Sequence, residues 1–209
     1  MTTQELIIMW LNIIGTVAFA ISGAFVAIDK KMDILGISIL GLTTAVGGGM
    51  IRDLILGNLP PEVFKNPIFA LIAIGISLIV FIRKKVAYNY DENKYYQIIL
   101  FWMDSIGLAA FTVTSISIGY NMGYESIFLL VFLGVVTGVG GGVLRDLFAM
   151  ETPQIFVQDF YASASIIGAI VTASLMHYAG QINAMIIGAF VIVFLRYLAR
   201  KFDWNLPKI

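Results

Sequence analysis

Gly41-Leu-Thr-Thr-Ala-Val-Gly-Gly-Gly-Met-Ile-Arg-Asp-Leu54 occurs a second time, almost unchanged, as Gly134-Val-Val-Thr-Gly-Val-Gly-Gly-Gly-Val-Leu-Arg-Asp-Leu147. Nine of these fourteen positions are identical. Both copies lie inside apolar stretches of the chain, and each places an Arg-Asp pair three residues after three consecutive glycines. So long a match between distant stretches of one chain indicates that the sequence contains an internal repeat.

The repeat extends beyond this motif. Trp10-Leu-Asn-Ile-Ile-Gly-Thr-Val-Ala-Phe19 pairs with Trp102-Met-Asp-Ser-Ile-Gly-Leu-Ala-Ala-Phe111, at a displacement of 92 residues rather than 93. Pro60 and Pro153 also fall in register. Three matches in the same order predict two duplicated structural units.

The composition is that of a membrane protein. The chain has 209 residues, of which 59% are hydrophobic and only 12% are charged, and its mean hydropathy is +0.91. A soluble protein of this size has too little interior to bury so many apolar residues. A bilayer core of about 30 Å is crossed by about 20 helical residues. We therefore expect an all-α integral membrane protein whose main partner is the lipid bilayer.

Seven apolar stretches are long enough to be transmembrane helices. They cover residues 5–28, 34–56, 67–82, 95–119, 124–149, 155–177 and 182–199. The N-terminal stretch lacks the basic residues of a signal peptide, so we expect it to be retained as the first helix. We interpret the chain, residues 1–209, as a single transmembrane domain with seven spans.

The basic residues predict an orientation. With seven spans, the loops and tail on one side of the membrane receive nearly all the lysines and arginines, whereas those on the other side receive only Lys65. The basic side holds Lys30, Lys31, Arg83, Lys84, Lys85, Lys94, Arg200, Lys201 and Lys208. Because basic loops stay in the cytoplasm, the N-terminus is predicted to lie outside the plasma (inner) membrane and the C-terminus inside. The formal net charge of zero indicates no nucleic-acid partner.

Three spans per unit have a topological consequence. An odd number of crossings turns the second unit upside down relative to the first, as in the inverted repeats of many transport proteins. We assign repeat one to about residues 5–83, repeat two to about 95–177, and a seventh helix without a repeat partner to about 180–201.

The glycine triplets are candidates for an ion pathway. Three consecutive glycines, Gly47, Gly48 and Gly49 in one unit and Gly140–Gly142 in the other, weaken a helix by about 3 kcal/mol relative to alanine. We expect a kink or an unwound turn there, with freed carbonyls that replace the hydration shell of a cation. The alternative is close helix packing, because small residues also recur at four-residue spacing through both triplets.

The Arg-Asp pairs place charge inside the membrane. Arg52 and Asp53 follow the first triplet, and Arg145 and Asp146 follow the second. Buried charges of this kind normally face a cavity or a partner. Since adjacent residues do not share a helix face, we expect each Arg and its neighbouring Asp to have different partners. The alternative is a pair of side chains that extend to the membrane surface without a role in transport.

Further polar residues are candidates for the same pathway. Asp104 lies within the fourth span, in register with Asn12 of the first, and is a candidate cation contact or a packed carboxylate. Ser22, Thr44 and Thr137 can line a pore or bond to their own helix backbone.

Enzyme chemistry finds no support in the sequence. There is one histidine, no cysteine and no His-Glu-x-x-His motif, and the glycine triplets lack the Lys-Ser/Thr of a phosphate-binding loop. We therefore expect no catalytic residues, no bound metal and no cofactor.

The sequence resembles the prokaryotic trimeric intracellular cation channels, a bacterial membrane family also labelled glycine transporter domains. The resemblance covers nearly the whole chain and is carried by Phe19-Ala-Ile-Ser-Gly23, Gly47-Gly-Gly-Met-Ile-Arg-Asp53 and Gly140-Gly-Gly-Val-Leu-Arg-Asp146. It implies a homotrimer with one potassium-permeable pore per subunit, formed by helices kinked at the triplets. It also implies potassium or sodium as the permeant ion. Animal members carry a basic Lys-Glu-Val sequence in the fourth helix that is missing here, which puts regulation by inositol lipids in doubt.

Two other functions fit the same pattern. The architecture also serves secondary transporters, so a carrier of a small solute such as glycine is the main alternative to a channel. A structural or accessory membrane protein without a conducting path is a third possibility.

Overall fold

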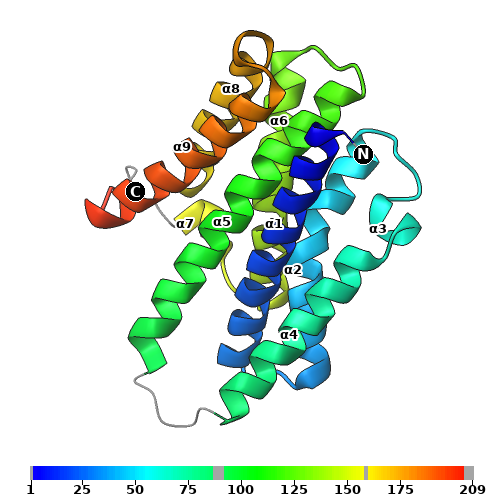
Figure 1. The fold of residues 1–209 in the computed structure, drawn as a ribbon. Coiled ribbons are helices and arrows are strands. Elements are labelled where there is room, and N and C mark those ends of the chain that lie inside the picture. Colours follow the sequence, from blue (N-terminus) through cyan, green and yellow to red (C-terminus); the bar gives the residue numbers. More distant parts are fainter. Residues whose placement is uncertain (1, 87–91, 158–159, 205–209) are drawn as a thin grey trace.

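The computed structural model describes residues 2–86, 92–157 and 160–204, which form nine helices and no strand (Figure 1). These helices are α1 (Thr3–Asp29), α2 (Ile34–Ile55), α3 (Glu62–Lys65), α4 (Ile68–Val86), α5 (Glu92–Asn121), α6 (Ile127–Phe148), α7 (Gln154–Val157), α8 (Tyr161–Ala179) and α9 (Gln181–Lys201). The expectation of an all-α protein is confirmed for this part of the chain.

Six helices are long and apolar enough to cross a membrane: α1, α2, α5, α6, α8 and α9. The third predicted span corresponds to α4, whose apolar part, Ile68–Arg83, is shorter. The prediction for the sixth span was wrong at its start, because residues 155–157 belong to the separate short helix α7 and α8 begins only at Tyr161. Phe160, before α8, has a left-handed backbone conformation (φ 62°), which turns the chain between the two helices.

Local capping fixes where several helices begin. Thr2 and Glu5 form a reciprocal capping box at the start of α1. Asp33 accepts a hydrogen bond from the Gly36 N–H at the start of α2, and Ser126 caps α6 in the same way. Both central helices of the repeats thus begin at a side chain that satisfies otherwise unpaired backbone donors.

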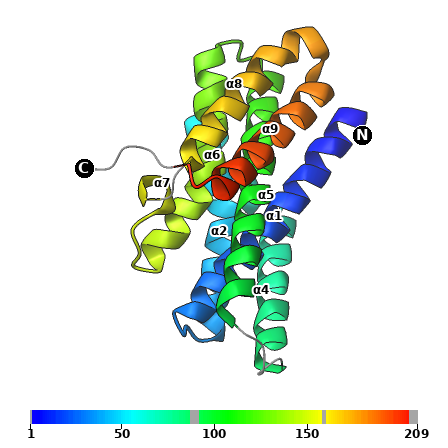
Figure 2. The same ribbon diagram turned by 90° about the vertical axis from the view of Figure 1, so that its left-hand side faces the viewer.

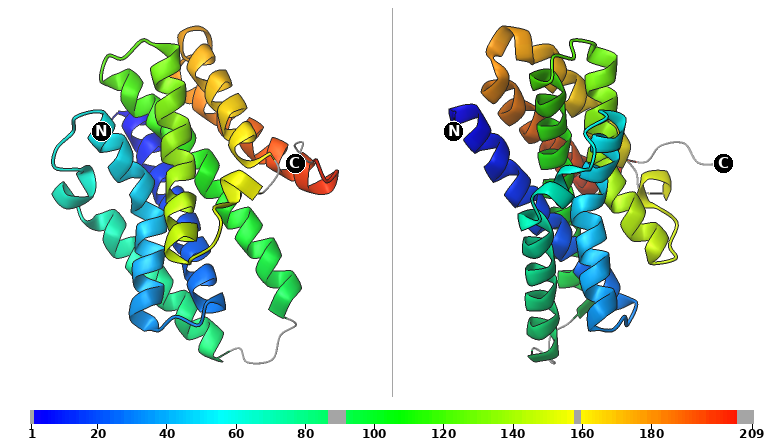
Figure 3. Two further views of the ribbon diagram at one scale, coloured as in Figure 1. Left: turned by 180° about the vertical axis from the view of Figure 1, so that it is seen from behind. Right: turned by 90° about the vertical axis from the view of Figure 1, so that its right-hand side faces the viewer.

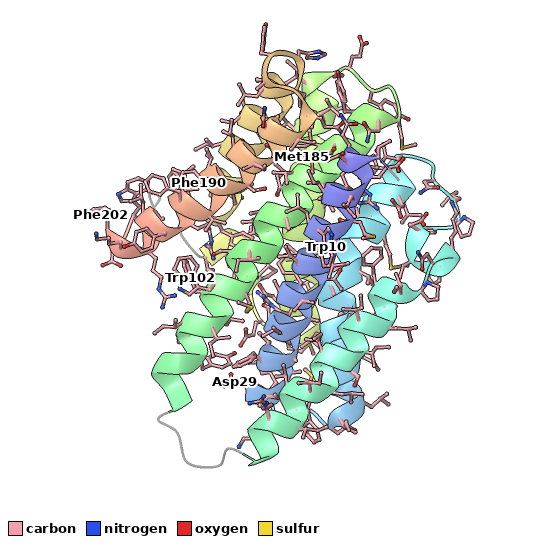
Figure 4. All side chains as sticks on the ribbon, in the orientation of Figure 1. Trp10, Asp29, Trp102, Met185, Phe190 and Phe202 are labelled. Carbon is pink, nitrogen blue, oxygen red and sulfur yellow. The ribbon has the colours of Figure 1, made fainter. Side chains whose placement is uncertain are left out.

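Helices α1, α2, α5 and α6 form the centre of the molecule. Helix α4 packs on the outside of α1 and α2, whereas α8 packs on α6 and α5, and α9 packs on α8 and α5 (Figures 1 and 2). The side chains of Phe190 on α9, of Phe202 just after it, and of Trp10 on α1 are all exposed (Figure 4). This apolar outer surface fits a lipid environment.

Corresponding helices of the two halves run in opposite directions. In Figures 1 and 3, α1 leads away from the end of the bundle that holds the N-terminus, and α5 leads toward it; α2 and α6 are likewise opposed. The contacts between the halves are reciprocal. The Phe19 ring lies on Gly107 of α5, and the Phe111 ring lies on Gly15 of α1, 3.1 Å from the position of a Cβ there.

The glycine triplets form the crossing of α2 and α6. A Cβ at Gly48 would overlap the carbonyl oxygen of Thr137, and a Cβ at Gly141 would overlap that of Thr44. Only glycine allows the two backbones to approach so closely. The expected unwound turn was wrong, because α2 and α6 are continuous helices through both triplets. The close contact between the two helices offsets the low helix propensity of glycine.

Candidate functional site

Arg145 lies at the centre of a buried polar network. Its side chain is fully buried, and Nη1 donates hydrogen bonds to Asp104 Oδ1 at 2.7 Å and to Ser22 Oγ at 2.5 Å. Its Nε donates to Asp146 Oδ1 at 2.8 Å. The guanidinium of α6 is therefore tied to α1 and α5 and is balanced by two carboxylates. Pairing of this kind is what permits a charge to lie inside the membrane.

Helix α9 contributes a second arginine to this network. Arg196 is 3% exposed, its Nη2 lies 3.7 Å from Asp104 Oδ2, and its Nε donates to Ser105 Oγ at 3.2 Å. Its guanidinium also lies over the rings of Phe101 and Tyr161, with 4.9 and 4.6 Å to the ring centroids. We call Arg145, Asp104, Asp146, Arg196 and Ser22 the inner arginine site; its two positive and two negative charges cancel.

Arg52 occupies the corresponding position in the first half. Its Nε and Nη2 donate to Asp53 Oδ1 at 2.9 and 2.7 Å. The other carboxylate oxygen of Asp53 accepts the Glu62 N–H at 2.8 Å, at the start of α3. We call Arg52 and Asp53 the outer arginine site. Asp146 repeats the pattern, because its Oδ2 accepts the Gln154 N–H, also at 2.8 Å, at the start of α7.

One expectation for these pairs was wrong. Each arginine bonds to its neighbouring aspartate, although adjacent residues lie on different helix faces. The reason is that both pairs lie in the last turn, where the long arginine side chain folds back toward an aspartate held by the next short helix. The alternative, in which the side chains extend to the membrane surface, does not fit their burial, since Arg52 is 8% exposed and Arg145 is fully buried.

The two sites differ in what surrounds them. Asp104 of the inner site corresponds to Asn12, so no carboxylate of α1 faces Arg52. A cavity of about 120 Å³ occupies this region instead, lined by Arg52, Asn12, Thr16 and Gly49 among others. No hydrogen-bond partner is found for the Asn12 amide or the Thr16 hydroxyl within the part of the chain that the structure describes. Free polar groups thus line this cavity.

The other predicted pathway residues lie around these sites. The Thr44 and Thr137 hydroxyls bond to their own helices, at Leu40 O and Leu133 O. Gly142 borders the inner site, where a Cβ would lie 3.7 Å from Asp104 Oδ1. The remaining triplet residues, Gly47, Gly48, Gly140 and Gly141, lie at the α2–α6 crossing. Whether these residues line a conducting path remains a prediction.

Sequence reasoning missed Arg196 and Tyr161. Arg196 carried a signal, because it is a charge within the seventh apolar span and such charges normally have a partner. Tyr161 carried none, because its place beside the inner site depends on where α8 begins. Among the described residues, no cluster of histidine, aspartate and glutamate has the arrangement of a metal site.

The fold and the paired arginine sites define an all-helical membrane protein with two related three-helix halves. Residues 9–85 and 101–177 each match the family model described as Glycine transporter, together well over half of the chain. The chain therefore belongs to this family. It is 35% identical over 205 residues to the inner membrane protein YadS of Escherichia coli K12, which covers 97% of this chain and 96% of that protein.

Solved structures extend the similarity to the fold. A TRIC cation channel matches with a TM-score of 0.82 and 37% identity, over 95% of both chains. The trimeric intracellular cation channel of Rhodobacter sphaeroides matches with a TM-score of 0.86 and 31% identity, over 94% of this chain and 98% of that one. The resemblance drawn from the triplets and the Arg-Asp pairs is thus confirmed.

Proposed function

We propose that this protein is a monovalent cation channel of the inner membrane, permeable to potassium, and that it conducts ions rather than catalysing a reaction. The main support is the 37% identity, at a TM-score of 0.82, to a TRIC cation channel along almost the whole chain. The two arginine sites and the cavity at the outer one supply polar groups inside an otherwise apolar bundle.

In this proposal the pathway runs between α1, α2, α5 and α6, from the cavity at Arg52 toward the network at Arg145. The two three-helix units form an inverted repeat, which the opposite directions of their helices and their reciprocal contacts support. Because α2 and α6 are unbroken, we assign any bending at the triplets to the conducting state. The structure then corresponds to a closed state.

The arginines need a role compatible with cation flow. A bare guanidinium repels a cation, but Asp53 balances Arg52, and Asp104 and Asp146 together balance Arg145 and Arg196. The inner site therefore presents no net charge, and Asp104 and Asp53 remain the groups that attract a cation when an arginine moves away. In this proposal the arginines hold the pathway shut until the helices separate.

The assembly and orientation follow the sequence expectations. We propose a homotrimer with one pore in each subunit, the N-terminus outside and the C-terminus in the cytoplasm. The basic residues of the loops support this orientation, because they gather on the side of Lys30 and Arg200.

Potassium flux into liposomes that contain the purified protein tests the channel proposal. We expect voltage-driven flux above that of empty vesicles, with sodium passing less well and chloride excluded. An Arg145→Ala variant that still folds serves as a perturbed control. Flux no greater than that of empty vesicles, at several voltages and calcium concentrations, would contradict the proposal.

A carrier of a small solute such as glycine is the second candidate. It is favoured by the match to the Glycine transporter model and by the cavity of about 120 Å³ at Arg52, a residue that can bind a carboxylate. Saturable uptake of labelled glycine, accelerated by unlabelled glycine on the opposite side of the membrane, would favour the carrier over the channel.

A further inference from the structure

The two arginine sites are separated by one aromatic layer. Along α1, Thr16 lines the outer cavity, Phe19 follows, and Ser22 contacts Arg145. Along α5, Ile118 and Phe111 line the same cavity, and Asp104 bonds to Arg145 two turns before Phe111 in the helix. Both helices therefore give the same order of layers: cavity, phenylalanine, inner arginine site.

The two rings fill this layer. Phe19 is fully buried and Phe111 is 7% exposed, and their centroids are 5.3 Å apart with the ring planes tilted by 45°. Phe19 lies against Gly107 on one side and against Gly141 on the other, where a Cβ would be 3.0 Å from its Cε2. Phe111 lies against Gly15. Three glycines thus leave the space that the two rings occupy.

An apolar constriction of this kind stops ions without any charge. Water leaves a narrow apolar passage, and an ion that enters it loses its hydration shell without gaining protein ligands. We propose that Phe19 and Phe111 form the constriction that closes the pathway between the outer cavity and the inner arginine site. This inference rests on the proposed function, because it assumes a pathway through the same four helices.

The structure also assigns different roles to the two rings. Phe19 is fully buried, lies against glycines of two helices and does not line the cavity. Phe111 borders the cavity of about 120 Å³, which is comparable with the cavity of about 150 Å³ that accommodates a benzene molecule. Movement of Phe111 into this cavity is therefore the step that opens the constriction.

The chain contains no cysteine, so a single introduced thiol reports on access to water. Ser22→Cys places a thiol just beyond the two rings, and Asn12→Cys places one in the outer cavity. The reagent is a charged methanethiosulfonate, applied to the detergent-purified protein. We expect the thiol at position 22 to react slowly in the parent protein and about tenfold faster after Phe111→Ala, as a barrier lowered by about 1.4 kcal/mol gives.

Three control variants distinguish opening of the constriction from a general loosening of the fold. A thiol introduced by Ala184→Cys, at a fully buried position on α9, stays protected in the Phe111→Ala background, and Asn12→Cys reacts in both backgrounds. Phe128 on α6 is 81% exposed, and Phe128→Ala leaves the reaction at position 22 unchanged. If Phe111→Ala does not fold, Phe111→Val is used with the same thiols.

Three outcomes decide the inference. Faster labelling at position 22 together with higher potassium flux supports both the constriction and the channel. Faster labelling without any flux supports the constriction and counts against the proposed function. Unchanged labelling at position 22 after substitution of Phe111 and of Phe19, or equal acceleration at position 184, overturns the constriction.

Discussion

Asp104→Asn removes the one carboxylate that faces both Arg145 and Arg196. Asp104 Oδ1 lies 2.7 Å from Arg145 Nη1, and Oδ2 lies 3.7 Å from Arg196 Nη2, with all three side chains buried. Asparagine keeps the shape and one acceptor oxygen but leaves the inner arginine site with a net charge of +1. The substitution also gives α5 the residue type that α1 carries at the corresponding position, Asn12.

The size of the loss in free energy of unfolding distinguishes an unpaired buried charge from a lost hydrogen bond. Removing one partner of a buried ion pair costs about 3–5 kcal/mol, whereas a hydrogen bond between membrane helices is worth about 0.6 kcal/mol. Because asparagine still accepts from Arg145, we expect Asp104→Asn to lower the free energy of unfolding by about 3 kcal/mol, at the lower end of that range.

Unfolding by SDS in mixed micelles, followed by circular dichroism, measures this change. Asn12→Ala is the matched control: its side chain lines a cavity and its loss costs about 0.5 kcal/mol or less. Arg196→Gln combined with Asp104→Asn restores charge balance and recovers part of the loss. If Asp104→Asn lowers the free energy of unfolding by less than about 1 kcal/mol, Asp104 is not the group that neutralises Arg145. Water or another group would then already do so.

Four further substitutions test other parts of the structure. Gly48→Ala forces apart the backbones of α2 and α6 and lowers the free energy of unfolding by about 1–3 kcal/mol. Gly75→Ala, whose added methyl group meets open space beside α4, raises the free energy of unfolding by up to about 1 kcal/mol. SDS unfolding of the two variants checks both values. Glu151 accepts a hydrogen bond from Lys30 at 2.6 Å and raises the pKa of that ammonium. The stability that this ion pair contributes is complete below the ordinary lysine pKa of 10.5 and is lost as the pH rises through the higher pKa of the folded state. Because both side chains are more than a third exposed, thermal unfolding of Glu151→Gln shows only a small loss of stability at neutral pH. Arg52→Gln removes positive charge from the outer cavity and raises potassium flux in liposomes about fivefold, which corresponds to about 1 kcal/mol for two charges 4 Å apart in water; unchanged or lower flux contradicts a cation path past Arg52.

Hydrophobic patterning predicted most of the fold. Hydrophobic length alone located six spans and the shorter α4, since a bilayer imposes the same length on each helix. The start of α8 was missed because the apolar run continues through Ile155, and hydropathy does not register a backbone turn at Phe160. The short helices α3 and α7 were missed because four residues carry no periodic pattern.

The candidate site was only partly predictable. The Arg-Asp pairs and Asp104 were found because a charge in an apolar run is rare and needs a partner. The helical conformation of the glycine triplets was not predicted, because helix propensity describes one helix alone. The contact of Gly48 with the opposite helix decides whether the turn unwinds. The pairing of Phe19 with Phe111 depends on the crossing of α1 and α5, which no local pattern encodes.

Heavy-atom replacement of potassium locates the pathway directly. Crystals of the protein grown in rubidium or thallium salts, measured for anomalous scattering, reveal where the permeant ion lies. We expect peaks inside each protomer, between α1, α2, α5 and α6, in the outer cavity near Asp53 or beside Asp104. Peaks found only between protomers or on the outer surface of the helices would contradict a pathway through the bundle.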